Sequence, residues 1–218
     1  MTPANMPDPT SLVFILVSLS LAPFLAMMVT SFVKIVTVCT LIRNAMGIQQ
    51  IPPNMVVNGL AIILSIYIMN PVLEDTLDII QKENITKADV GTMRSVAEKA
   101  KVPLETFLLK HTTARDRQFF IKTAQKLWGP ERAAKLKESD MIVLVPAFTV
   151  AELTSAFQIG FLIYLPFIAI DLIVSNILLA MGMMMVSPMT ISLPFKLLLF
   201  VLVDGWTRLL QGLILSYA

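Results

Sequence analysis

The sequence predicts an all-α protein of membrane type, in which two apolar helical hairpins flank a polar, mainly helical insert. Three observations lead to this fold class. Hydrophobic residues make up 56% of the 218 residues and charged residues only 15%, whereas soluble domains are closer to half apolar and a quarter charged. Apolar stretches long enough to cross a bilayer lie on both sides of one charged stretch. That charged stretch, residues 74–140, holds 13 of the 17 basic and 11 of the 15 acidic residues.

Composition and motifs exclude several classes of function. A net charge of +2 gives no basis for binding nucleic acid. The single cysteine, Cys39, excludes an internal disulfide and a cysteine-rich metal site. No catalytic or phosphate-binding motif is present, so we expect no enzyme, cofactor or metal. The lone histidine, His111, lies in the charged stretch and is typical of a surface residue.

Residues 1–73 are predicted to form the N-terminal apolar hairpin. Residues 12–33 and 55–73 carry no charge, and at roughly 22 and 19 residues each is long enough to span a bilayer core. Pro23 predicts a kink in the first segment. The connector at 47–54 contains two consecutive prolines, which favour a turn. The N-terminus has no basic residue, so we predict no cleavable signal peptide and expect the first segment to remain in the mature protein.

Residues 74–140 are predicted to form the insert from several short amphipathic helices. The spacing Thr-x-x-Asp, which resembles a capping box at a helix start, occurs at 86–89 and 113–116. Pro103 is expected to separate two helices. The sequence Trp-Gly-Pro at 128–130 fits a helix stop followed by a new helix. The mixed charges are most simply a solvated face.

Residues 141–218 are predicted to form the C-terminal apolar hairpin. Apolar regions at 141–176 and 189–203 flank the sequence LAMGMMMVSP at 179–188. Methionine is unbranched and polarisable, so a methionine cluster repacks around objects of different shape. Repeated around a ring of hairpin tips, it would form a soft hydrophobic constriction. Filling a core or facing lipid is the more common role of such a cluster, and the residues alone leave both interpretations open.

Five ionisable residues within or beside the apolar segments are candidate functional residues: Lys34, Glu152, Asp171, Lys196 and Asp204. Such groups cost about 2.5–3.5 kcal/mol each at membrane depth, so they are usually paired or face water. Lys34, Lys196 and Asp204 lie near segment ends, where snorkelling or pairing at an interface is expected. Glu152 and Asp171 are more central. For these two we favour ion pairs between subunits over a proton relay.

The distribution of basic residues predicts the orientation of the chain. Lys34 and Arg43 lie around the first hairpin loop and Lys196 lies near the second, whereas the N-terminus has no basic residue. Short loops rich in lysine and arginine stay in the cytoplasm, while long loops cross largely regardless of charge. We therefore expect both hairpin tips in the cytoplasm, with the insert and both termini in the periplasm.

Two long motifs resemble a known family. The sequences PAFTVAELTSAFQIGF at 146–161 and PFKLLLFVLVDGW at 194–206 are similar to the two signatures of the flagellar FliP and virulence SctR export-apparatus proteins. Between them, MGMMMVSP resembles the methionine gasket of that family. The resemblance covers most of the chain and departs at Ala151, where the family often has a small hydroxyl residue or histidine. The absence of a predicted signal peptide favours the virulence branch.

The resemblance implies a core subunit of the type III secretion export gate in the bacterial inner membrane. Family members form a ring of five copies with SctS-like and SctT-like subunits, and SctU-like and SctV-like subunits associate with it. Unfolded secreted proteins pass through the ring. By this resemblance Met183, Met184 and Met185 are the gasket residues. The family also implies that the hairpins stack helically, so that apolar segments bury against other subunits more than against lipid.

Two other functions remain as alternatives. One is an ion-coupled small-molecule transporter that uses Glu152 and Asp171, and the other is an assembly scaffold that does not line the pore. A transporter is expected to work alone in liposomes and to lose function on Asp171→Asn. An export-gate subunit is expected to form an oligomer and to require its partners.

Overall fold

The structure, a computed structural model, describes residues 9–48, 50–82 and 90–218, and within them the regular structure is entirely helical. This confirms the predicted fold class. The helices are α1 (Pro9–Met28), α2 (Phe32–Ala45), α3 (Asn54–Lys82), α4 (Val90–Ala100), α5 (Val102–Lys110), α6 (Ala114–Trp128), α7 (Pro130–Ala133), α8 (Met141–Ala180), α9 (Pro188–Leu202) and α10 (Gly205–Leu215).

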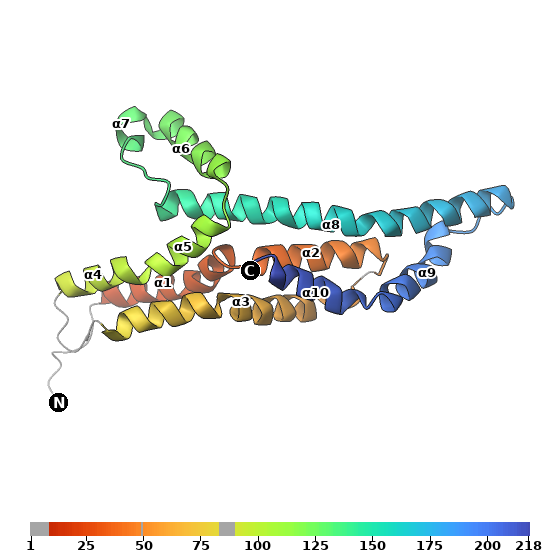
Figure 1. Cartoon of the computed structure of the whole chain (residues 1–218), viewed down its shortest axis with the longest axis horizontal. Helices are drawn as coiled ribbons and strands as arrows, with labels where there is room; N and C mark the ends of the chain where they lie inside the picture. The colour runs from red at the N-terminus through yellow and green to blue at the C-terminus, as the bar shows by residue number, and fades with distance from the viewer. Residues whose placement is uncertain (1–8, 49, 83–89) are drawn as a thin grey trace.

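The molecule is elongated along helix α8, which runs over most of its length (Figure 1). Helix α2 lies beside α8, and α3 returns along α2 to form the first hairpin. Helices α9 and α10 fold back from the far end of α8 to form the second hairpin. The turns that follow α2 and α8 both lie away from the insert helices α4 to α7, and α8 extends beyond the turn after α2.

The first apolar segment is two helices rather than one span. Helix α1 continues through Pro23 and ends at Met28, and the chain bends by 64° before α2 begins at Phe32. The backbone therefore breaks at 29–31 and not at the proline. Tertiary packing explains the position of the break, because α2 buries one face against its neighbours whereas the described side chains of α1 before Met27 are exposed.

Two helices of the described chain have the length and composition to cross a membrane, and two bent helix pairs raise the number of spans to four if each pair is counted as one. Helix α3, with 29 residues, and α8, with 40, meet this test alone. The bent pairs α1–α2 and α9–α10 meet it only if each pair is counted as one span. Helix α8 accommodates Pro146 and Pro166 without ending, and α3 continues past the apolar stretch to Lys82. The chain is therefore a helical membrane protein.

The insert follows several of the local signals in the sequence. Pro103 occupies the first turn of α5, just after the break from α4. The hydroxyl of Thr113 caps α6 by accepting a hydrogen bond from the backbone N–H of Asp116 at 3.2 Å. Gly129, with φ +85°, separates α6 from α7. These predictions are confirmed, whereas the similar spacing at 86–89 lies outside the described residues.

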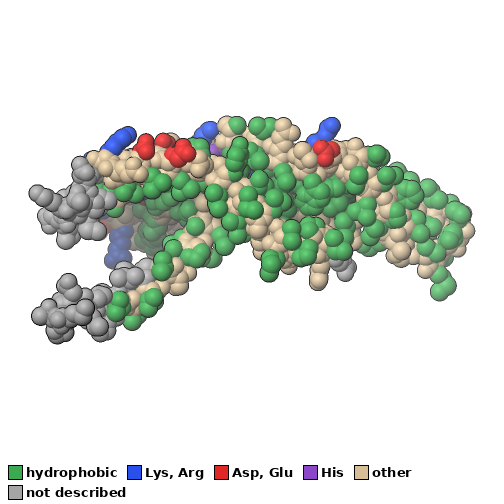
Figure 2. All heavy atoms as spheres, turned by 90° about the horizontal axis from the view of Figure 1, so that it is seen from below, with side chains coloured by type: hydrophobic (Ala, Val, Ile, Leu, Met, Phe, Trp, Pro, Cys, Tyr) green, Lys and Arg blue, Asp and Glu red, His purple; other side chains and the backbone are tan. Residues whose placement is uncertain are grey.

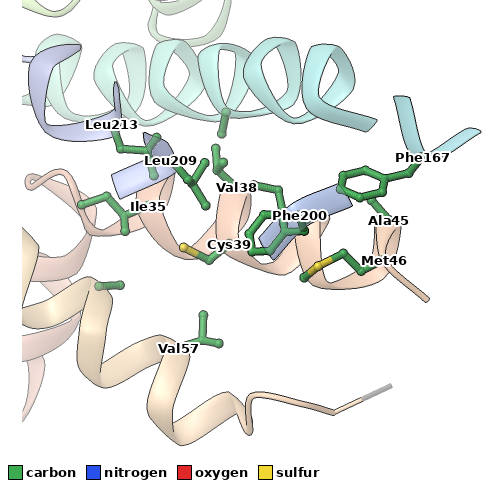
Figure 3. Close-up of a cluster of buried hydrophobic side chains, with 13 residues drawn as sticks. Ile35, Val38, Cys39, Ala45, Met46, Val57, Phe167, Phe200, Leu209 and Leu213 are labelled. Atoms are coloured by element: carbon green, nitrogen blue, oxygen red, sulfur yellow. The ribbon is translucent and has the colours of Figure 1, made fainter. Parts of the chain in front are cut away.

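One face of α2 forms the centre of the main hydrophobic core (Figure 3). Ile35, Val38, Cys39 and Ile42 recur at helical spacing and are almost completely buried. Cys39 is thus a small core residue, as predicted. Side chains from α3, α8, α9 and α10 close over this face, among them Val57, Phe167, Phe200, Leu209 and Leu213. Each fully buried large aliphatic side chain contributes about 1.5–3 kcal/mol to the stability of the fold. Because both hairpins place side chains in this core, the packing of both depends on α2.

A second, smaller core fixes the insert to the apolar body. Leu108 of α5 is buried against Leu144 and Phe148 of α8, and Val29 packs at its edge. The insert therefore rests on the first turns of α8 and does not stand apart from the hairpins.

Much of the surface is apolar. Figure 2 shows a face on which hydrophobic side chains extend along the body, while basic and acidic side chains gather in a few groups. Large exposed side chains include Ile63 and Tyr67 of α3 and Phe157, Phe161 and Leu162 of α8. Water-soluble monomers rarely expose apolar patches of this extent, so these faces are suited to lipid or to other subunits.

Candidate functional site

The methionine turn, residues 181–187, joins α8 to α9 at the tip of the second hairpin. Helix α8 ends in a Schellman motif: the N–H of Met183 donates to the carbonyl of Leu178 at 2.9 Å, and the N–H of Gly182 donates to that of Leu179 at 3.1 Å. Gly182 adopts φ +73°, which a residue with a side chain rarely adopts. The backbone of the turn is therefore well defined.

The side chains of the methionine turn project away from the rest of the chain. Met184 is 81% exposed, and Met181, Met183 and Met185 are also exposed. Met46 and Met69, by contrast, are buried and fill the core of the hairpins, whereas Met55 and Met189 are exposed. Filling the core of the same chain is therefore not the role of the methionine turn.

The first hairpin turn lies close to the second. A Cβ placed on Gly47 would be 4.0 Å from the Cε atom of Met189, directly after the methionine turn. Arg43 holds the first turn in shape by donating to the carbonyl of Pro52 at 3.1 Å and to Oδ1 of Asn54 at 2.6 Å. The first hairpin turn thus lies beside the start of α9.

An ion pair between a buried lysine and a partly exposed aspartate braces this end of the second hairpin. Lys196 Nζ of α9 lies 2.6 Å from Asp171 Oδ2 of α8 and donates to the carbonyl of Ala45, the last residue of α2, at 3.1 Å. Cations near the carbonyl end of a helix are stabilised by the helix dipole. Ser192 donates to the other oxygen of Asp171 at 2.6 Å. One lysine therefore ties three helices together beneath the methionine turn.

A second ion pair, in which both residues are buried, lies nearer to the N-terminal end of α8. Lys34 Nζ of α2 is 2.9 Å from Glu152 Oε1 of α8, and the two residues are only 4% and 2% exposed. The hydroxyl of Tyr217 donates to the other carboxylate oxygen. The Lys34 ammonium also lies 4.0 Å from the centre of the Tyr217 ring, a cation–π contact. The pair is thus almost completely shielded from solvent.

Both ion pairs differ from the favoured interpretation of the sequence. Glu152 and Asp171 were expected to find partners on a neighbouring subunit, but each is paired with a lysine of the same chain. Lys34 and Lys196 were expected to snorkel or to pair at an interface, but both ammonium groups point inward and are buried. The partners lie 118 and 25 residues apart in the sequence, so segment position alone does not reveal them.

Asp204 stands apart from both pairs. It is exposed, adopts the left-handed conformation at φ +53° and precedes the first residue of α10. The Thr207 hydroxyl donates to its carboxylate at 3.0 Å. Asp204 therefore marks the bend of 60° between α9 and α10.

The sequence interpretation missed the aromatic side chains around the Lys34–Glu152 pair. His111 is half-buried, with ring centroids 4.7 Å from Phe107 and 5.0 Å from Tyr217, so its assignment as a surface residue is wrong. Burial, followed by the nearby charges of Lys34 and Lys110, lowers the pKa of His111 to about 4. No spacing in the sequence links Tyr217 to residues more than 60 positions away, and only the amphipathic pattern of α10 hints at a buried face there.

Within the described residues the site has no set of side chains arranged to hold a metal ion. The site is an exposed group of methionine side chains on a hydrogen-bonded turn, above an ion pair that joins α8 and α9.

The fold defines a multi-helix membrane protein, and its sequence matches the FliP family over residues 15–213. The chain therefore belongs to the FliP family. It is 53% identical to the Yop proteins translocation protein R of Yersinia pestis over 213 residues, and the alignment covers 98% of each chain. It is 50% identical to the hypersensitivity response secretion protein HrcR of Ralstonia nicotianae, over 95% of this chain and 96% of the relative. It is 46% identical to the virulence protein YscR of Salmonella typhimurium, over 98% of this chain and 100% of the relative.

The family membership confirms the resemblance seen in the two motifs. The names of these relatives refer to translocation, secretion and virulence, which supports the virulence branch of the family. Proteins of this family are components of a secretion apparatus, and the chain is placed among them.

Proposed function

We propose that this protein is a pore-forming core subunit of a type III secretion export gate, which passes unfolded proteins across the bacterial inner membrane through a methionine-lined constriction. The observation that carries the proposal is the methionine turn, in which four methionine side chains, Met181, Met183, Met184 and Met185, are exposed together at a hairpin tip. The names of the relatives, which refer to protein translocation and secretion, support the same conclusion.

The physical requirements of such a pore match the side chains of the turn. A channel for many unfolded sequences needs a lining without fixed hydrogen-bond geometry, and it has to exclude ions when no substrate is present. Methionine meets both needs, because its thioether chain has several rotatable bonds and a weakly polar surface. Narrow hydrophobic constrictions also block ions by excluding water. Met183, Met184 and Met185 are the proposed gasket residues.

The backbone beneath these side chains is fixed while the side chains are free. The Schellman motif defines the end of α8, and the Lys196–Asp171 pair joins α8 and α9 to α2. A ring of such hairpins would hold the methionine side chains at a constant height around an axis. We propose that Lys34, Glu152, Asp171 and Lys196 serve this function by bracing the subunit.

The proposed assembly is a homo-oligomer of five copies with SctS-like, SctT-like, SctU-like and SctV-like subunits. Within it, both hairpin turns face the cytoplasm and the insert faces the periplasm. Cys39 is the only cysteine and is buried. The substitutions Met185→Cys and Glu131→Cys, made one at a time, would therefore report the side of the membrane on which the methionine turn and the insert lie. A membrane-impermeant maleimide added to spheroplasts should label the cysteine at 131 and leave that at 185 unlabelled.

The gasket is tested by replacing Met183, Met184 and Met185 with alanine together. The triple variant should assemble normally and should raise ion leakage through the complex in planar bilayers, because shorter side chains widen the constriction. Met55→Ala is the matched control, since Met55 is exposed but lies outside the turn. Wild-type conductance in an assembled triple variant would refute the gasket assignment.

The transporter alternative has less support. Glu152 and Asp171 each have a lysine partner in the same chain, which leaves neither carboxylate without a counter-charge for ion coupling.

A further inference from the structure

Tyr217 lies where three parts of the chain meet. Its hydroxyl donates to Glu152 of α8, and its ring covers the ammonium of Lys34 of α2 at 4.0 Å. On the other side the ring stacks on Phe107 of the insert helix α5, with centroids 6.1 Å apart and planes inclined by 13°. It also meets His111 edge-on at 5.0 Å. Tyr217 is itself buried.

The hydroxyl and the ring of Tyr217 make different contacts. The hydroxyl completes the hydrogen bonding of a buried carboxylate, which would otherwise carry the cost of an unpaired acceptor. Burial and the adjacent Glu152 raise the pKa of the Tyr217 phenol, so the hydroxyl remains protonated and able to donate. The ring supplies the surface against which Phe107 and His111 pack. Aromatic pairs of this kind contribute about 0.5–1.5 kcal/mol beyond the area they bury.

The segment that carries Tyr217 includes only the last turn of α10. Leu209, Leu213 and Tyr217 recur at intervals of four residues and form one buried stripe. The two leucines fasten α10 to the core around α2, whereas Tyr217 lies beyond the end of the helix at Leu215. Its backbone N–H is held by a single-turn hydrogen bond to the carbonyl of Ile214 at 3.1 Å. Release of Tyr217 therefore requires only the residues after Leu213 to unwind.

We propose that Tyr217 is a positioning residue that latches the insert helix α5 to the buried Lys34–Glu152 pair, so that its release loosens the insert while both hairpins stay folded. The latch joins α5 of the insert to α2 and α8, the two helices that carry the buried ion pair. The latch depends only on contacts within the chain, so it can be tested independently of the proposed pore function.

The test compares hydrogen–deuterium exchange of the full chain in detergent micelles among four proteins. Tyr217→Leu removes the ring and the hydroxyl, Tyr217→Phe removes the hydroxyl alone, and Leu215→Ala is a matched control on the same segment because Leu215 is exposed. In Tyr217→Leu, exchange of residues 102–110 should rise about tenfold or more, with no change in residues 188–202. The Tyr217→Phe and Leu215→Ala proteins should keep the protection of α5.

A second measurement reports the exposure of His111 itself, while the exchange of residues 188–202 distinguishes a latch from general loss of structure. His111 is the only histidine, so its side-chain NMR signals titrate without overlap. Its pKa of about 4 reflects burial first, so opening the latch in Tyr217→Leu should shift it toward 6.5, while Tyr217→Phe should leave it near its wild-type value.

Three outcomes would overturn the proposal. Unchanged exchange of residues 102–110 in Tyr217→Leu would show that Tyr217 does not hold α5. An equal rise over residues 188–202 would show a general structural role instead of a latch. Loss of α5 protection in Tyr217→Phe equal to that in Tyr217→Leu would show that the ring does not dock the insert.

Discussion

The Lys34–Glu152 pair gives the sharpest prediction about stability. With the charged atoms 2.9 Å apart, an effective dielectric constant of 20 gives an attraction of about 6 kcal/mol. Burying both groups costs several kcal/mol each, so the pair as a whole contributes little net stability. Removing only one partner leaves the other charge buried and unmatched. We therefore expect Lys34→Met and Glu152→Leu each to lower the free energy of unfolding by about 3–5 kcal/mol.

The double variant is expected to behave differently from either single one. Lys34→Met with Glu152→Leu removes both charges and keeps similar side-chain volumes, so it should be more stable than either single variant, and it should fall short of the wild type by about 1–3 kcal/mol because the buried Tyr217 hydroxyl loses its acceptor. Reversible denaturation of the full chain in mixed micelles measures all four proteins of this cycle. A matched cycle at the partly exposed Arg117–Glu138 pair should show a coupling below about 1 kcal/mol.

Two results would refute this reasoning. Single variants that lose less than about 1 kcal/mol would show that water reaches the pair and screens it. A double variant as unstable as the worse single one would show that shape and hydrogen bonding at this position matter more than charge.

Three further predictions concern single residues. The pKa of His111 is lowered to about 4, so between pH 6.5 and 4 His111 is protonated in the unfolded chain and neutral in the folded chain. The free energy of unfolding should therefore fall by about 1–2 kcal/mol as the pH is lowered over this range, after allowance for partial exposure. This fall should be absent in His111→Gln. Gly205→Ala should lose about 1–3 kcal/mol, because its Cβ would lie 2.4 Å from the Phe200 ring, whereas Gly212→Ala on the same helix meets nothing within 4 Å and should be neutral or stabilising. Asp204→Asn should be neutral and Asp204→Val should cost about 1–2 kcal/mol, because the backbone is left-handed at φ +53°. Denaturation midpoints measure all three.

The helices were largely predictable because their signals are local. Apolar runs of bilayer length identified the hairpins, and the Thr113 cap, Pro103 and the glycine at 129 marked helix boundaries that the structure reproduces. The break at 29–31 was missed. It depends on how α2 packs against helices more than 100 residues away in the sequence, and no local residue type specifies it.

The candidate site divides in the same way. Met183, Met184 and Met185 stood out by their spacing, and the positive φ of Gly182 explains why a glycine lies inside the cluster. The ionisable residues also stood out, because charges are rare in apolar segments. Their partners did not, since a pair such as Lys34 with Glu152 is created only when two distant helices come together.

The same basic residues that predicted the orientation are buried in the structure and join parts of the fold. Lys34, Arg43 and Lys196 are buried and hold an ion pair, a hairpin turn and a helix end, respectively. In the folded protein they therefore do not present a positive surface at the tips. The fold supplies an independent constraint, because the turns after α2 and α8 both lie away from the insert helices α4 to α7 (Figure 1). Any orientation that places one tip in the cytoplasm places the other there too, so labelling at Met185 alone decides the side of both.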